Sequence, residues 1–166
     1  GVTVANAAGC SSVAAPTSIV VFAAPTATIT PSAATTFCQG ASINLTANAA
    51  AGYAWSNGAS TSSISVNNSG NFTVTVTDAN GCSAISSVVP VTVNAVPVAS
   101  IQANGPTTVC QGTSVVLTAN GGTGFAWSNS ETTASITVNA TGSYGVTVTN
   151  AAGCTSVVTP VSITVN

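Results

Sequence analysis

Basic residues are absent from this chain of 166 residues. It has no Lys, no Arg and no His, and its only carboxylate side chains are Asp78 and Glu131. Charged residues make up 1% of the sequence, against roughly 25% in an ordinary soluble domain. With a net charge of −2, the chain offers no cation to the phosphates of nucleic acid or anionic lipid. We therefore expect no nucleic-acid partner.

The same gaps exclude most catalytic chemistry. Ser and Thr are abundant, but a hydroxyl nucleophile needs a base, and neither His nor Lys is present. The two carboxylates are too few for a calcium cage, and they occupy different positions of the repeat described below, so they form no hydrolytic pair. Zinc would need His or closely spaced cysteines. We predict no enzyme activity, no cofactor and no metal site.

Long apolar runs are also missing. No stretch approaches the ~20 residues of a membrane-spanning helix, because Pro, Ser or Thr interrupts each one, so we expect no membrane insertion. The hydrophobic fraction of 45% and the many β-branched residues argue against disorder. The chain starts without Met and without a signal peptide, which predicts a mature or cut polypeptide.

The cysteines reveal a repeat of 72 residues. Residues 23–94 align with 95–166 without a gap, and 36 of the 72 pairs are identical. Residues 1–10 match 145–154 with one difference. A fixed period indicates an array of similar units. We predict two complete repeats, 23–94 and 95–166, preceded by residues 1–22 as the last two strands of an incomplete one.

Each repeat shows the alternation of β-strands. Ile43, Leu45 and Ala47 alternate with polar residues, and Phe72–Thr77 alternates apolar residues with threonines, a pattern typical of half-buried strands. Turn residues recur every 8–12 positions, which favours an all-β sandwich. The alternation places these eight side chains in the core: Leu45, Trp55, Val74, Val76, Leu117, Trp127, Val146 and Val148. Thr73, Thr75 and Thr77 should face outward or contact a neighbouring copy.

A family resemblance follows from four segments of the repeat. They are Cys-Gln-Gly at 38–40 and 110–112, aromatic-Ala-Trp-Ser-Asn at 53–57 and 125–129, Val-Thr-Val-Thr at 74–77 and 146–149, and Gly-Cys at 81–82 and 153–154. The chain resembles the immunoglobulin-like or PKD-like repeats of large secreted and surface proteins of Bacteroidota, many of them associated with gliding motility and type IX secretion. The resemblance implies tandem immunoglobulin-like β-sandwiches and no shared catalytic site.

Cysteines at matching positions indicate disulfides and an oxidising, extracellular compartment. The leading pairing lies within each repeat, Cys38 with Cys82 and Cys110 with Cys154. The alternative is a bond between repeats, Cys38 with Cys154 or Cys82 with Cys110, because an immunoglobulin topology places the two turns of one repeat at opposite ends. Cys10 lacks a partner within its fragment, and we expect it to bond to a cysteine equivalent to Cys38 outside this chain.

Short, Pro-containing junctions at 22–25 and 94–97 favour a rod over flexibly linked beads. The sequence therefore predicts a structural or adhesive extracellular filament or stalk at the cell surface. Its expected partners are other copies or further repeats of the same protein, and surface glycans are a further candidate. The alternative is a carbohydrate-binding or accessory module of a secreted enzyme.

Overall fold

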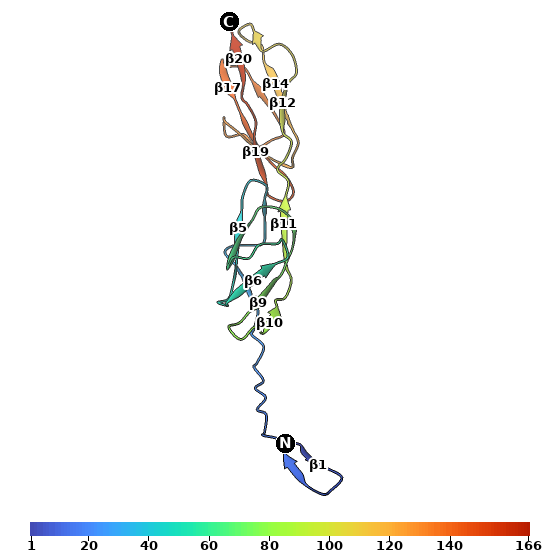
Figure 1. Cartoon of the computed structure of the whole chain (residues 1–166). Coiled ribbons are helices and arrows are strands. Elements are labelled where there is room, and N and C mark those ends of the chain that lie inside the picture. The colour runs from blue at the N-terminus through green and yellow to red at the C-terminus, as the bar shows by residue number, and fades with distance from the viewer.

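The computed structural model describes all residues, 1–166, as strands and turns without a helix. Two β-sandwiches lie end to end, and a small amino-terminal hairpin hangs from the first one on an extended segment (Figure 1). The two termini lie at opposite ends of a long, narrow molecule. The predicted all-β sandwich class is confirmed. No helix long and apolar enough to cross a membrane is present.

The first sandwich has nine strands in two layers. They are β3 (Ile29–Pro31), β4 (Thr36–Cys38), β5 (Ile43–Ala47), β6 (Gly52–Trp55), β7 (Ser63–Val66), β8 (Gly70–Phe72), β9 (Val74–Thr77), β10 (Ser83–Ile85) and β11 (Val89–Asn94). One layer has the antiparallel order β3-β5-β7. The other layer consists of β10-β9-β6 and β4-β11-β8. Only Thr73 separates β8 from β9, so these two groups continue one another along the sandwich.

The second sandwich repeats this topology. Its strands are β12 (Ser100–Ala103), β13 (Thr108–Val109), β14 (Val115–Asn120), β15 (Gly124–Trp127), β16 (Ser135–Val138), β17 (Gly142–Tyr144), β18 (Val146–Thr149), β19 (Thr155–Val157) and β20 (Val161–Val165). Their orders are β12-β14-β16, β15-β18-β19 and β13-β20-β17. In both sandwiches a short early strand runs parallel to the last one, β4 beside β11 and β13 beside β20.

Each sandwich has its own apolar core between the two layers. Along β5, Ile43, Leu45 and Ala47 are buried while the residues between them are exposed, because successive side chains of a strand point to opposite faces. The eight side chains that the alternation places in the core are all 0–4% exposed: Leu45, Trp55, Val74, Val76, Leu117, Trp127, Val146 and Val148. The outward-facing residues Thr73, Thr75 and Thr77 are half-buried.

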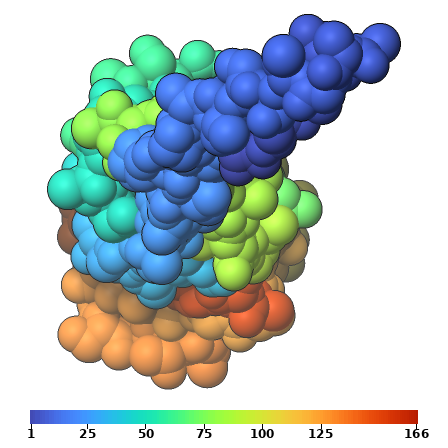
Figure 2. Space-filling view, turned by 60° about the horizontal axis from the view of Figure 1, so that its bottom comes forward, coloured from blue at the N-terminus to red at the C-terminus, as the bar shows by residue number.

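The amino-terminal segment stands apart from both cores. Its hairpin of β1 (Thr3–Ala5) and β2 (Ser11–Val13) projects from the first sandwich, and Figure 2 shows it (dark blue) reaching away from the body of the molecule. Val4 is 65% exposed, whereas the equivalent Val76 is 0% exposed. The same residue in the same type of hairpin is exposed here because no opposing layer covers it.

Candidate functional site

The two carboxylates serve turns rather than a shared site. Asp78 lies in the first sandwich, where its Oδ1 accepts hydrogen bonds from the backbone amides of Asn80 (2.9 Å) and Cys82 (2.8 Å). Glu131 lies in the second sandwich, where its Oε1 accepts one from Asn129 Nδ2 at 3.1 Å. No group of three or more His, Cys, Asp or Glu side chains comes together in the chain. Neither carboxylate is therefore placed beside a second acid.

The aromatic side chains belong to the cores. Trp55 and Trp127 are each 4% exposed, and their Nε1 atoms donate to the carbonyl oxygens of Thr61 at 2.7 Å and Thr133 at 2.9 Å. Tyr53 is half-buried, and its hydroxyl accepts a bond from the amide of Ala50. Among the aromatic residues, only Phe22 of the amino-terminal segment is an exposed large hydrophobic, at 52%. The sandwiches thus present no fully exposed aromatic ring, and their remaining aromatic side chains are half-buried against the cores: Phe37, Tyr53, Phe72, Phe125 and Tyr144.

The junction between the sandwiches brings together two turns that each carry a cysteine. On the side of the second sandwich, the turn between β18 and β19 holds Cys154. Asn150 Oδ1 accepts hydrogen bonds from the amides of Ala152 and Cys154, both at 3.0 Å, and the Asn150 amide donates to the Cys154 carbonyl at 2.9 Å. Gly153 closes the turn at φ 78°, a conformation that costs glycine little. The turn fixes the direction of the Cys154 side chain.

On the side of the first sandwich, Cys38 is the last residue of β4. That strand runs parallel to β11 and pairs Cys38 with Asn94, after which the Gln39 amide donates to the Asn94 carbonyl at 2.8 Å. Since Asn94 ends β11 and the linker to the second sandwich begins there, the pairing holds Cys38 at the junction.

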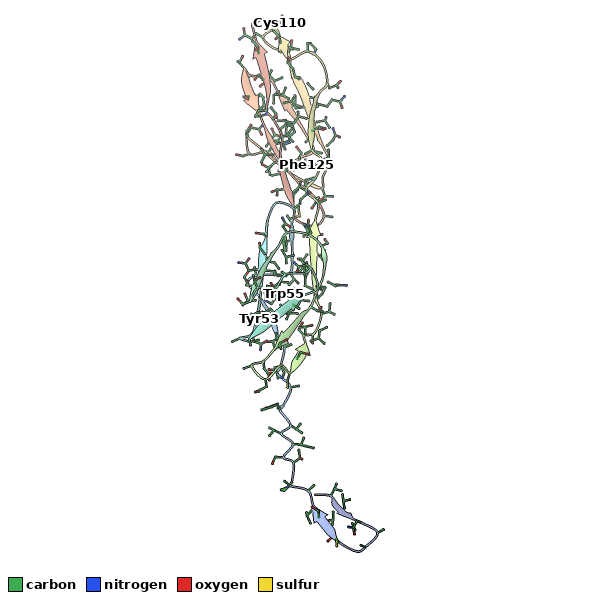
Figure 3. The ribbon with its side chains drawn as sticks, in the orientation of Figure 1. Tyr53, Trp55, Cys110 and Phe125 are labelled. Carbon is green, nitrogen blue, oxygen red and sulfur yellow. A yellow bond between two sulfur atoms is a disulfide. The ribbon has the colours of Figure 1, made fainter.

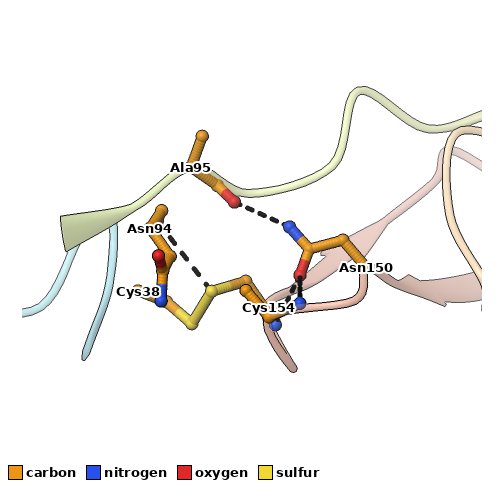
Figure 4. The surroundings of a disulfide bond; sticks show 6 residues. Cys38, Asn94, Ala95, Asn150 and Cys154 are labelled. Atoms are coloured by element: carbon orange, nitrogen blue, oxygen red, sulfur yellow. Dashed lines mark hydrogen bonds between the residues drawn. A yellow bond between two sulfur atoms is a disulfide. The ribbon is translucent and has the colours of Figure 1, made fainter. Parts of the chain in front are cut away.

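A disulfide joins Cys38 to Cys154 across the junction (Figure 4). The two Cα atoms are 5.6 Å apart, within the usual range for a disulfide, and Cys154 is 1% exposed. Asn150 Nδ2 donates to the carbonyl oxygen of Ala95 at 2.8 Å, and Pro97 of the five-residue linker 95–99 is buried. The hydrogen bond from Asn150 and the buried proline therefore hold the linker against the base of the second sandwich, and the disulfide holds the first sandwich there.

The leading disulfide pairing within each repeat is wrong, and the pairing between repeats is found instead. Cys38 lies at the end of its sandwich where β11 leaves, whereas Cys82 lies in the β9–β10 turn at the opposite end. The intradomain pairing assumed a shortened strand count that would bring these turns together, but both sandwiches have their full set of strands. Cys10, Cys82 and Cys110 are free, and the bond expected from Cys10 to a cysteine outside the chain stays a prediction.

Sequence reasoning missed the role of the asparagine and aspartate that begin these turns. The pattern Asn/Asp-x-x-Gly-Cys occurs at 6–10, 78–82 and 150–154, and in each copy the first side chain accepts bonds from the amides of the third and fifth residues. Side chains of Asn and Asp commonly fold back on the backbone in this way. The threefold spacing was therefore a readable signal for a rigid, cysteine-presenting turn.

The largest hollow in the surface lies beside the Cys38 turn. It measures about 420 Å³ and is lined by Gln39, Gly40, Ala41, Ser42, Asn67 and Asn68. The lining offers amide and hydroxyl groups without a charge.

The chain has distant likenesses among solved structures. No protein-family model matches the chain, and no curated protein sequence matches it. Among solved structures, the three N-terminal domains of the highly immunogenic outer capsid protein of bacteriophage RB49 are 21% identical, with 84% of this chain and 59% of that chain covered and a TM-score of 0.43. This chain thus spans less than two thirds of that three-domain structure.

Two further solved structures resemble the chain at a similarly low sequence identity. The fibronectin(III)-like modules of CbhA from Clostridium thermocellum are 17% identical, covering 84% of this chain and 93% of that chain with a TM-score of 0.41. A 1.5-MDa bacterial ice-binding adhesin is 21% identical, covering 99% of this chain and 72% of that chain with a TM-score of 0.38. The assignment of each repeat as an immunoglobulin-like sandwich rests on its strand order and two-layer core.

Proposed function

We propose that this chain is a structural or adhesive segment of an extracellular rod, built from immunoglobulin-like repeats that perform no catalysis. The observation that carries the proposal is the Cys38–Cys154 disulfide across the junction. A bond inside one repeat would stabilise that repeat alone, whereas this bond fixes the direction in which the next repeat follows. Such a staple suits a protein whose task is to hold a shape over a distance.

The composition supports an extracellular location. Disulfides persist in oxidising compartments, and a chain without Lys or Arg has no trypsin sites. It also has no Met, the side chain that oxidises to a sulfoxide. The resemblance of the repeat to those of Bacteroidota surface proteins linked to gliding motility and type IX secretion supports the same setting.

The rod would act as a spacer or as an array of weak contacts. Many copies of one weak site raise the overall affinity through effective concentration, and surfaces with little net charge do not repel one another. The partners of the rod are accordingly further repeats or copies of the same protein. Surface glycans are a second candidate contact, but Trp55 and Trp127 offer them no stacking surface because both side chains are buried.

The stiffness of the junction can be measured on the intact chain by small-angle X-ray scattering. The wild type and the Cys110→Ser control, which changes a free cysteine, should both give the profile of two sandwiches in line. Cys38→Ser should broaden the distribution of distances between the sandwiches. Identical profiles for all three would show that the staple does not set the shape.

The location and the alternative function need separate experiments. Antibodies raised against the chain should label extended structures on the surface of intact cells that make the protein. Exclusively internal labelling would contradict the proposal. Specific binding of the chain to defined sugars on a glycan array would favour the carbohydrate-binding module instead.

A further inference from the structure

The far tip of the second sandwich repeats the side of the junction that carries Cys38. Cys110 is exposed there and lies at the end of the molecule opposite to the amino terminus (Figure 3). The Gln111 amide donates to the Asn166 carbonyl at 2.8 Å and the Thr113 amide to the Cys110 carbonyl at 3.1 Å. The turn after Cys38 has the same two bonds, at 2.8 Å and 3.2 Å. The turn after Cys110 therefore repeats the backbone hydrogen bonds of the turn that carries Cys38 at the junction.

The base of the first sandwich repeats the side of the junction that carries Cys154. Cys82 is free and half-buried, and it lies in a turn in which Asp78 replaces Asn150. The Asp78 amide donates to the Cys82 carbonyl at 2.9 Å, the distance found between Asn150 and Cys154. The molecule thus carries two pairs of such turns. One pair is joined at the junction by Cys38 and Cys154, and the other pair carries the free cysteines Cys82 and Cys110.

We propose that the tip of one copy docks on the base of a second copy and that a disulfide forms between Cys110 of the first and Cys82 of the second. The docked pair continues the interface already made by Cys38 and Cys154. The inference rests on the proposed rod function and identifies another copy of this chain as the partner of the Cys110 turn and of the Cys82 turn. The rod would then grow head to tail.

The bond needs an oxidant, which we identify as a small-molecule disulfide such as oxidised glutathione. The Cys110 thiolate attacks one sulfur of the small disulfide, forming a mixed disulfide and releasing one thiolate. The Cys82 thiolate of the second copy then attacks the Cys110 sulfur and releases the second thiolate. One disulfide forms in the protein, one small disulfide is reduced to two thiols, and the two cysteine protons go to solvent or to the released thiolates.

Docking requires the amino-terminal segment of the second copy to move aside. Phe22 occupies the repeat position of Asn166, so residues 1–22 of the second copy would overlap the last strands of the first. No hydrogen bond joins this segment to the first sandwich. Residues 1–24 are all exposed, and residues 15–25 make no backbone hydrogen bond.

The Asp78 substitution contributes to that freedom. In the second sandwich, the Asn150 side-chain amide holds the Ala95 carbonyl at 2.8 Å. The equivalent pair at the base of the first sandwich is Asp78 and Ala23, and a carboxylate has no hydrogen to donate to a carbonyl oxygen. The linker before the first sandwich therefore lacks the bond that holds the linker before the second.

The experiment uses the full chain with Cys10→Ser in every variant, so that the third free cysteine cannot react. One variant also carries Cys82→Ser and presents only Cys110, and the other carries Cys110→Ser and presents only Cys82. Each is oxidised with oxidised glutathione, alone and as an equimolar mixture, and run on a non-reducing gel. Bonds are located by mass spectrometry after digestion with chymotrypsin or pepsin, because the chain has no trypsin site.

We expect each variant alone to stay at 15.8 kDa and the mixture to give a product of twice that mass, joined by Cys110 and Cys82. The Cys10→Ser chain with both remaining free cysteines should give a ladder of higher oligomers. The Cys38–Cys154 peptide, recovered from every sample, reports that the variants have folded.

Three outcomes would overturn the proposal. They are dimers of either variant alone, equal amounts of all pairings in the mixture, and no mixed dimer while the Cys38–Cys154 bond is intact. None of these would affect the scattering test of the proposed function, since that test concerns the junction inside a single copy. Conversely, if the gel shows the mixed dimer but scattering shows a flexible junction, the docking of two copies is supported and the stiff rod is rejected.

Discussion

Reduction of the junction disulfide should change how far the chain can be stretched. When tension is applied through the two termini, the covalent path runs from residue 1 to Cys38, crosses the disulfide to Cys154 and continues to residue 166. The bond encloses residues 39–153, so residues 1–38 and 154–166, 51 of the 166 residues (38 + 13), carry the load. Both cores lie almost entirely inside the shielded loop.

The magnitude follows from the length of an extended residue. At ~3.5 Å per residue, the oxidised chain should reach about 180 Å and the reduced chain about 580 Å, a difference of about 400 Å. Single-molecule force spectroscopy of the chain with its three free cysteines changed to Ser, with and without reductant, measures this difference directly. Bonds inside each repeat would shield two segments of 44 residues (82 − 38 and 154 − 110) and give about 310 Å. A difference near that value, or none, would refute the junction staple.

Four further predictions concern the stability of the fold. Leu45→Ala should lower the free energy of unfolding in urea by roughly 2–5 kcal/mol, because the side chain is 0% exposed. Ser130 is the only non-glycine residue with a positive φ, 72°. Ser130→Gly should therefore raise the free energy of unfolding by about 1 kcal/mol, and Gly58→Ser, at the equivalent turn of the first sandwich, should lower it by about the same amount. Effects of the same sign would refute this. Val76→Asp should prevent folding of the first sandwich, whereas Val4→Asp should leave the melting temperature unchanged, because only Val76 is buried. A chelator should leave the melting temperature unchanged while a reductant lowers it, and a large chelator effect would contradict the reading that the fold needs no metal.

The cores could be read from the sequence because they depend on local alternation. Leu45 and Val76 sit in runs where every second residue is apolar, and the period of two alone decides which face is buried. The tryptophans follow the same rule. No long-range information is needed to place these residues.

The disulfide could not be read in this way because it depends on where the ends of the strands lie. Cys38 closes the three-residue strand β4, which is too short to show alternation and which pairs in parallel with β11, far along the chain. That pairing, rather than any feature near Cys38, carries the cysteine to the junction. An immunoglobulin topology places the two turns of one repeat at opposite ends, whereas a reduced strand count would bring them together, and the sequence is compatible with both.

The exposure of Val4 shows a second limit of sequence reasoning. Residues 1–10 and 145–154 differ at one position, yet Val4 is 65% exposed and its equivalent Val148 is 0% exposed. Burial here is decided by the opposing layer, which residues 1–22 do not bring with them. The alternation within a segment predicts which face of the strand is apolar. It does not predict whether an opposing layer is present to bury that face.

The most direct test of the account is the disulfide map of the folded, non-reduced chain. Digestion with pepsin at low pH, which suppresses exchange, followed by mass spectrometry identifies the partner of each cysteine. We expect a peptide pair joining Cys38 to Cys154, which is lost on reduction. Peptide pairs joining Cys38 to Cys82 and Cys110 to Cys154 would contradict it, since each repeat would then be closed on itself and the junction would have no covalent staple.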